Sequence, residues 1–167
     1  MLRLERICVH SFLRSPLDAS SVVVDCGANR GTFSRWIAEN VGCTIHGFEP
    51  DPRFHSALPH LPKTTFHNFA VAHRAGRVRF NLGESLCSSL HYRESEAAEP
   101  VEVEAVTLPE FLGARGVHRV DLLKLDIEGE ELSVLGQTEG AFFSDGVAQI
   151  TVEFHDHKDP GAVPTIR

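Results

Sequence analysis

Apolar and polar positions along the chain first indicate a buried strand at residues 21–26, where Val22, Val23 and Val24 follow one another. An uninterrupted apolar run of this length is typical of a strand that is buried on both faces of a parallel sheet. Residues 32–41 follow with Phe33, Trp36 and Ile37 at helical spacing, which predicts a helix with one apolar face. The sequence therefore predicts a strand, a glycine-containing loop and a helix in direct succession.

Further elements follow in an alternating order. Apolar runs predict strands at residues 44–48, 64–71, 120–127 and 148–155, with short helices at 53–58, 107–114 and 130–135. Strict alternation at 77–82 and 101–106 predicts strands with one wet face, which we interpret as an inserted β-hairpin-like segment, with a polar surface loop at 83–100 between them. This order predicts an α/β fold: a Rossmann-like, doubly wound and mostly parallel sheet with helices on both faces.

The two ends of the chain carry weaker patterns. Leu2, Ile7, Phe12 and Leu13 predict an amphipathic lead-in helix within residues 1–18, which would cover one face of the sheet. Residues 156–167 contain several structure breakers and are predicted to be an irregular tail. At 167 residues the chain is expected to form a single domain, 1–167.

Composition narrows the class of protein. A net charge of −7 gives no general attraction to nucleic acid or to anionic lipid. The four cysteines are far apart and contain no CxxC pair, which favours reduced thiols and a cytoplasmic location. No apolar run approaches the roughly 18 residues of a membrane span, and charged residues near the N-terminus interrupt any signal-peptide core.

The loop after the first buried strand carries the candidate ligand site. Asp25, Gly27, Asn29 and Gly31 lie where ligands bind in open α/β sheets, although a glycine-rich turn alone also occurs as plain packing. Glu49 follows at the end of the next strand, at the spacing where a carboxylate meets the ribose of an adenosine-containing cofactor. Asn29 replaces a glycine of the dinucleotide fingerprint, and an acid at the mouth of the first strand, Asp25, suits the cationic S-adenosyl-L-methionine, which carries no phosphate.

Six motifs follow one another along the chain: VVVDCGANRGTFS, GFEPDP, FHNFAVAH, VTLPEFL, DLLKLDIEGEEL and ITVEFH. In sequence and in order they resemble the FkbM family of S-adenosylmethionine-dependent methyltransferases. The resemblance implies the strand order 3-2-1-4-5. It also implies that Asp25, Gly27, Asn29 and Gly31 line the methionine part of the cofactor, and that Glu49 binds the ribose with help from Asp51. Asn68 and Ala70 would flank the adenine, and Asp126 would face the methionine end or the substrate.

Candidate catalytic residues follow the fourth and fifth strands of the parallel sheet. Lys124, Asp126 and Glu128 alternate along one strand end, and Glu153 and His155 along the next, with His155 the best general base by its intrinsic pKa. An exposed position for His155 remains open. So does a divalent-metal site built from Asp126, Glu128, Glu153, His155 and His157, although nothing in the spacing requires one.

We expect an O-methyltransferase that acts on a hydroxylated small molecule such as a sugar or a polyketide-type product. A nucleotide-binding oxidoreductase of the NAD type and a non-catalytic cofactor-binding remnant are the alternatives. The family's strands six and seven have no counterpart in this sequence, so strand five is expected at a sheet edge. An apolar edge of this kind favours pairing with another copy of the chain, unless a longer native form supplies a covering strand.

Overall fold

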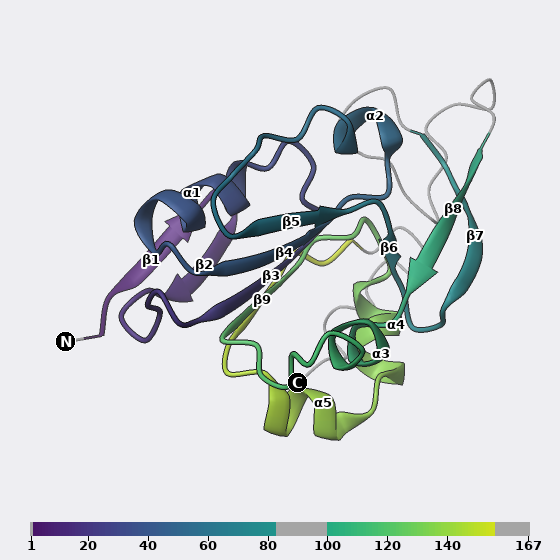
Figure 1. Cartoon of the computed structure of the whole chain (residues 1–167). Helices are drawn as coiled ribbons and strands as arrows, with labels where there is room; N and C mark the ends of the chain where they lie inside the picture. The colour runs from purple at the N-terminus through teal and green to yellow at the C-terminus, as the bar shows by residue number, and fades with distance from the viewer. Residues whose placement is uncertain (1, 83–99, 156–167) are drawn as a thin grey trace.

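A computed structural model describes residues 2–82 and 100–155 and shows an α/β fold around a parallel sheet (Figure 1). The five strands of this sheet run in the order β10-β9-β3-β4-β5, and every neighbouring pair is parallel. The carboxyl ends of all five strands therefore meet at one edge of the sheet. The strands are β3 (Val22–Cys26), β4 (Thr44–Phe48), β5 (Thr64–His67), β9 (Leu122–Leu125) and β10 (Ile150–Val152).

Strand β3 is central because its side chains are buried on both faces, as its valine run predicts. Val23 belongs to one apolar cluster, with Ile37 of the first helix, and Val24 belongs to a second cluster on the opposite face. Within residues 2–82 and 100–155, five helices connect or cover the strands, and the sequence did not indicate the last of them. They are α1 (Thr32–Asn40), α2 (Pro52–His55), α3 (Leu108–Gly113), α4 (Glu131–Gln137) and α5 (Gly140–Gly146).

The predicted lead-in helix at residues 1–18 is wrong. This segment forms an antiparallel β-hairpin of β1 (Leu4–Ile7) and β2 (His10–Leu13), joined by Cys8 and Val9. The spacing that suggested a helix is overridden by tertiary packing, because Phe12 packs edge-on against Phe33 and Trp36 of α1. The hairpin does cover one face of the sheet, since its buried side chains join the cluster under α1.

The hairpin is also attached to strand β10 at the sheet edge. The side-chain amide of Gln149 donates to the Leu13 carbonyl at 3.1 Å and accepts from the Leu13 N–H at 2.8 Å. Figure 1 shows β1 and β2 beside α1, on the far side of the sheet from α3. Gln149 thus fixes the hairpin at the amino end of β10, and His10 of β2 reaches Asp126 just after the carboxyl end of β9.

A second, three-stranded sheet contains the middle of the chain. Its order is β6-β8-β7, with β6 (Ala70–Val71) parallel to β8 (Val101–Val106) and β7 (Gly76–Phe80) antiparallel to β8. The prediction of one continuous strand at 64–71 is therefore wrong. Asn68 interrupts it, because its side-chain amide donates to the carbonyls of Glu49 and Pro50 and turns the chain away from β5. Most of the predicted polar loop, residues 83–99, lies outside the described residues.

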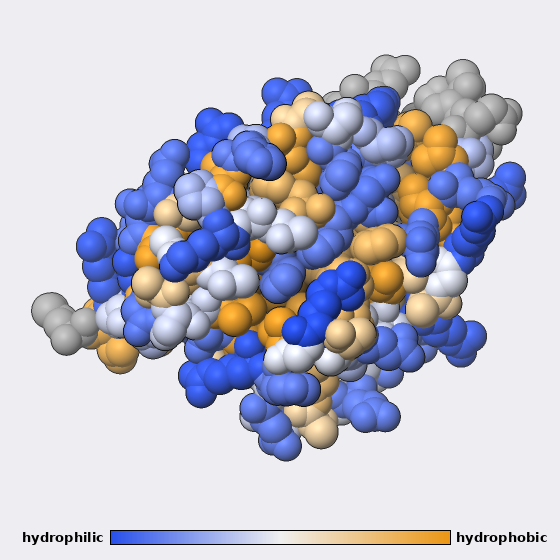
Figure 2. All heavy atoms as spheres, viewed as in Figure 1, coloured by the Kyte–Doolittle hydropathy of each residue, from blue (hydrophilic) through white to orange (hydrophobic). Residues whose placement is uncertain are grey.

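Strand β10 forms an edge of the parallel sheet and is shorter than the predicted strand 148–155. Ile150 is 40% exposed on this edge, and the predicted tail 156–167 lies outside the described residues. Among the residues that the structure describes, every helix is too short or too polar to cross a lipid bilayer. On the face shown in Figure 2, apolar atoms lie in separate patches among polar ones.

Candidate functional site

A cavity of about 560 Å³ opens at the carboxyl ends of the parallel strands. Its walls come from the loops after β3, β4, β9 and β10, from the link between β5 and β6, and from the β1–β2 hairpin. Cavities of this size hold small molecules and cofactors. The position is the one at which open α/β sheets bind their ligands.

The loop after β3 forms the floor of the cavity. Gly27 and Asn29 lie on the wall, and Gly27 has a φ of +80°. A Cβ atom on Gly27 would collide with the backbone carbonyl of Asp126, so this glycine is needed for the packing of two loops as well as for access to the cavity. Gly31 does not line the cavity; a Cβ atom there would face Pro59 at 3.0 Å.

Glu49 lies on the cavity wall and is only 5% exposed. Its two carboxylate oxygens accept the backbone N–H of Asn29 at 2.6 Å and that of Asp51 at 2.9 Å. Burial raises the pKa of Glu49 to about 7, against the opposing effect of these two hydrogen bonds. Each oxygen retains a second lone pair, so the carboxylate can still accept hydrogen bonds from hydroxyl groups of a ligand.

Asp51 and Asn68 support this region from outside the cavity wall. Asp51 is completely buried, caps α2 by accepting the backbone N–H of Arg53 at 2.9 Å, and pairs with the Arg53 guanidinium at 2.7 Å. Asn68 holds the carbonyl of Glu49, as described above. Ala70, at the start of β6, does lie on the wall. The structure thus places Ala70 in the cavity and gives Asp51 and Asn68 local structural contacts.

Lys124 is buried at the centre of the site and joins two strand ends. Its Nζ lies 3.0 Å from Asp25 Oδ1 and donates to the carbonyl of Gly27 at 2.8 Å. Asp25 is completely buried below the cavity and also accepts the hydroxyl of Ser34 at 2.7 Å. Burial acts to lower the pKa of Lys124, but Asp25 and Asp126 raise it above its usual value. The ammonium group therefore keeps its charge and fixes the loop after β3 through Asp25 and the Gly27 carbonyl.

Asp126 lies beside Lys124 and on the cavity wall. Its Oδ2 is 3.4 Å from Lys124 Nζ and 3.4 Å from His10 Nε2 of the hairpin. Burial acts to raise the pKa of Asp126, but His10 and Lys124 lower it below its usual range. The side chain is therefore an ionised carboxylate at neutral pH.

His155 is half-buried and paired with acids. Its Nδ1 lies 3.1 Å from Glu131 Oε1, and its Nε2 lies 3.6 Å from Glu128 Oε2. The hydrogen bond to Glu131 raises the pKa of His155 to about 9, so the ring is protonated at neutral pH. The exposed position left open by the sequence does not occur.

Glu131 organises the loop after β9. It is 1% exposed and accepts the backbone N–H groups of Ile127 at 2.8 Å and Gly129 at 3.1 Å, in addition to its contact with His155. Burial acts to raise the pKa of Glu131, and the His155 contact lowers it below its usual range. Glu131 belongs to the KLDIEGEEL motif, but its place there gave no sign that it would be buried.

His10 is a second residue that sequence reasoning missed. It lies on β2, is 3% exposed and faces the cavity, yet the helix predicted for this segment gave it no place in the site. Local sequence gave no clear signal for the hairpin, because its turn residues Cys8 and Val9 are not the glycine, asparagine or aspartate that two-residue hairpin turns favour.

An apolar wall completes the cavity on the side of the second sheet. Phenylalanines from three different segments and two small side chains form it, and they leave a surface that suits a flat aromatic ring. Phe80 shows that the inserted segment contributes to the site, which the sequence did not indicate. The wall consists of Phe48, Phe69, Ala70, Val71 and Phe80.

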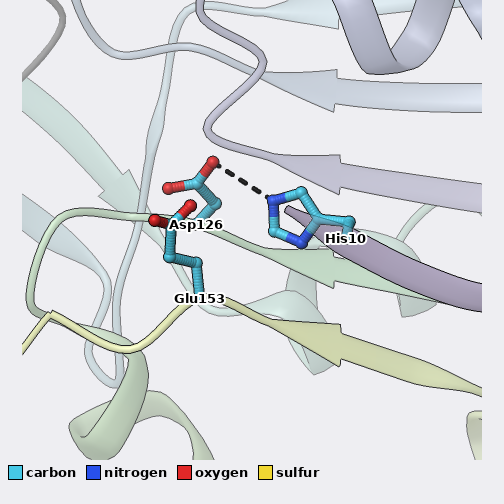
Figure 3. A group of neighbouring side chains, drawn as sticks. All are labelled: His10, Asp126 and Glu153. Carbon is cyan, nitrogen blue, oxygen red and sulfur yellow. Dashed lines mark hydrogen bonds and ion pairs between the residues drawn. The ribbon is translucent and has the colours of Figure 1, made fainter. Parts of the chain in front are cut away.

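Two groups of side chains have the donor atoms of a metal site within 4.8 Å of one another: His10, Asp126 and Glu153 (Figure 3), and Asp126, Glu128 and His155. The sequence-based metal hypothesis included four of these five residues and lacked His10. Its remaining member, His157, lies outside the described residues.

Known methyltransferases are similar to this chain over most of its length. A family model described as the methyltransferase FkbM domain matches residues 25–165. The chain is 28% identical to the 31-O-demethyl-FK506 methyltransferase FkbM of Streptomyces tacrolimicus, over 84% of this chain and 67% of that protein. It is 27% identical to methyltransferase 1 of Beauveria bassiana, over 86% and 68% of the two chains. It is 24% identical to the 2-O-methyltransferase NoeI of Sinorhizobium fredii, over 68% and 56%. No solved structure matches the chain significantly.

Proposed function

Because the chain belongs to the FkbM methyltransferase family, we propose that it transfers the methyl group of S-adenosyl-L-methionine to a hydroxyl oxygen of a small molecule. The observation that carries the cofactor is Glu49, a buried carboxylate on the cavity wall at the end of β4. A carboxylate in this position accepts hydrogen bonds from the two hydroxyl groups of an adenosine ribose. The names of two relatives specify methyl transfer to oxygen, which supports a hydroxyl as the acceptor.

The residues of the cavity fit this cofactor. The ribose would bind to Glu49, and the adenine would lie on the apolar wall that includes Phe69 and Ala70. The methionine part would lie along Gly27 and Asn29, where Asp126 supplies a negative charge to its cationic groups. Asp25 and Gly31 act from below the wall, Asp25 by fixing Lys124 and Gly31 by starting α1.

The cofactor supplies an electrophilic methyl group, and the protein's part is to align the acceptor and take its proton. A histidine that is already protonated at neutral pH cannot accept that proton. In this proposal the acceptor hydroxyl therefore donates to Asp126 or Glu128, and His155 holds Glu128 in place across 3.6 Å. Lys124 is a positioning residue, because it ties Asp25 and Gly27 to the strand that carries Asp126.

Calorimetric titration tests the cofactor first. S-adenosylmethionine and S-adenosylhomocysteine should each bind the 167-residue chain in the micromolar range, and NAD should not bind. Tighter binding of NAD would favour the oxidoreductase alternative and contradict the proposal.

Turnover is tested separately with a panel of hydroxylated sugars and polyketide-type alcohols. Release of S-adenosylhomocysteine that depends on the acceptor is expected. Asp126→Asn should lower that release while leaving S-adenosylhomocysteine binding within about tenfold of the unmodified protein, a loss of about 1.4 kcal/mol or less. Cofactor binding without methyl transfer to any acceptor would favour the non-catalytic alternative.

A further inference from the structure

His10, Asp126 and Glu153 converge from three segments that are far apart in the sequence. Figure 3 shows the carboxylates of Asp126 and Glu153 next to each other, at the ends of neighbouring strands, with the ring of His10 directed toward Asp126 from β2. One donor atom from each residue lies within 4.8 Å of the other two. All three residues line the cavity, so an ion bound among them would be accessible to a ligand.

The imidazole of His10 is held in a way that suits a metal ligand. The ring is buried, and its Nδ1 lies 3.4 Å from the hydroxyl of Thr151, which is itself buried. A hydroxyl can donate or accept, so Thr151 can support the tautomer in which Nε2 has a free lone pair. Metal-bound histidines usually have such a partner on their other nitrogen. Both ring contacts, to Thr151 and to Asp126, are 3.4 Å and therefore long for hydrogen bonds, so Asp126 does not hold the Nε2 atom tightly.

Neither Asp126 nor Glu153 is the closest carboxylate to a nearby cation. Lys124 is closest to the buried Asp25, at 3.0 Å, and lies 3.4 Å from Asp126. His155 is closest to the buried Glu131, at 3.1 Å, and lies 4.0 Å from Glu153. Each cation thus has a nearer acid of its own, and the space between Asp126 and Glu153 carries an excess of negative charge.

We propose that His10, Asp126 and Glu153 form a divalent-cation site in the wall of the cavity. One imidazole nitrogen and two carboxylates suit Mn²⁺ or a similar first-row ion, with remaining positions open to water or to ligand oxygens. The alternative group with His155 suits an ion less well, because that ring is held by Glu131. That the ion binds hydroxyl oxygens of the methyl acceptor rests on the proposed function; the binding of the ion itself does not.

Titration of the full 167-residue chain with Mn²⁺, followed by the electron paramagnetic resonance of the free ion, tests the site. One Mn²⁺ per chain is expected. Glu153→Gln removes a ligand charge and should weaken Mn²⁺ binding by about tenfold or more. Mutation of residues that only support metal ligands already lowers metal affinity by about 10–100-fold. His73→Gln is the matched control, because His73 also contacts a buried acid, Glu130 at 2.7 Å, but away from the cavity.

Spin-echo spectroscopy of the Mn²⁺ complex of the unmodified protein gives a readout that does not depend on the folding of a variant. A coupling to an imidazole nitrogen is expected, and His10→Gln should remove it. Absence of Mn²⁺ binding, equal affinity in Glu153→Gln, or bound Mn²⁺ without nitrogen coupling would each overturn the site. S-adenosylhomocysteine is titrated in parallel without Mn²⁺, so that a failure of cofactor binding is distinguished from a failure of this inference.

Discussion

Ionisation of Glu49 should be coupled to cofactor binding. The rise of its pKa from 4.5 to about 7, caused mainly by burial, means that the ligand-free protein disfavours the ionised form by about 3 kcal/mol. Ribose hydroxyls that donate to the carboxylate favour the ionised form, so binding lowers the pKa again. Affinity for S-adenosylhomocysteine should therefore rise as the pH increases through 7, and below about pH 6 it should fall by up to about tenfold per pH unit.

Calorimetry in two buffers with different ionisation enthalpies measures this coupling directly. Since about half of Glu49 is protonated at pH 7, binding should release up to about half a proton per ligand. Glu49→Gln should abolish the release and weaken binding by about 1.5–3 kcal/mol, the scale of hydrogen bonds to a charged group. Glu39→Gln, at an exposed position of α1, is the control and should behave as the unmodified protein. Affinity that does not vary with pH, together with no proton release, would refute the ribose role.

Ionisation of Glu49 also affects folding: it lowers the free energy of unfolding as the pH rises, whereas it raises the affinity for the cofactor. Because the folded-state pKa of Glu49 is raised, its contribution to the free energy of unfolding is fully present below about pH 4.5 and is lost as the pH rises to about 7. A bound cofactor removes part of this loss, so the stabilisation that it gives should be larger at pH 8 than at pH 6. Denaturant unfolding with and without S-adenosylhomocysteine at the two pH values provides the check.

Three further predictions concern the supports of the cavity. Gly27→Val should destabilise the fold by about 2–4 kcal/mol in urea unfolding, because its side chain would strike the loop after β9. Gly116→Val, which has a similar positive φ but open space around it, should cost only the backbone strain of about 1–2 kcal/mol. Lys124→Met should lower the free energy of unfolding by about 3–5 kcal/mol, since it leaves a buried carboxylate uncompensated, and the exposed Lys63→Met should stay within about 1 kcal/mol. The stabilisation from the ion pair of His155 is fully present below pH 6.5 and is lost as the pH rises to about 9. Thermal unfolding of His155→Gln should therefore lack that pH dependence. An equal dependence in the variant and in the unmodified protein would contradict the pairing.

Some features of this fold can be predicted from short stretches of sequence, and others depend on contacts between distant segments. The valine run of β3 must be buried on both faces wherever it lies, so its central position could be inferred from residue types alone. The hairpin at residues 4–13 depends on Phe12 meeting Phe33 and Trp36, contacts between segments about 20 residues apart that no local period reveals.

The candidate site shows the same division. Glu49 and Asp126 were identified because they end strands whose carboxyl ends must meet at one edge of the sheet. Strand position alone could not show that Lys124 is committed to Asp25, or that Glu131 raises the pKa of His155 to about 9. These properties depend on distances of 3.0 and 3.1 Å between side chains, and therefore on the packed tertiary structure.

The N-terminal hairpin lies outside the segment shared with the FkbM family, which begins at residue 25, yet it supplies one wall of the cavity. It is attached to the sheet by the backbone groups of Leu13, which bind Gln149, and by side chains on β2: Phe12 packs against α1, and His10 lies beside Thr151. The turn itself, Cys8 and Val9, lines the cavity apart from these attachments, so under the proposed function grafting a different turn between β1 and β2 would reshape this wall while leaving Glu49 and the loop after β3 intact. In such chimaeras, acceptor preference and cofactor affinity would vary as separate traits.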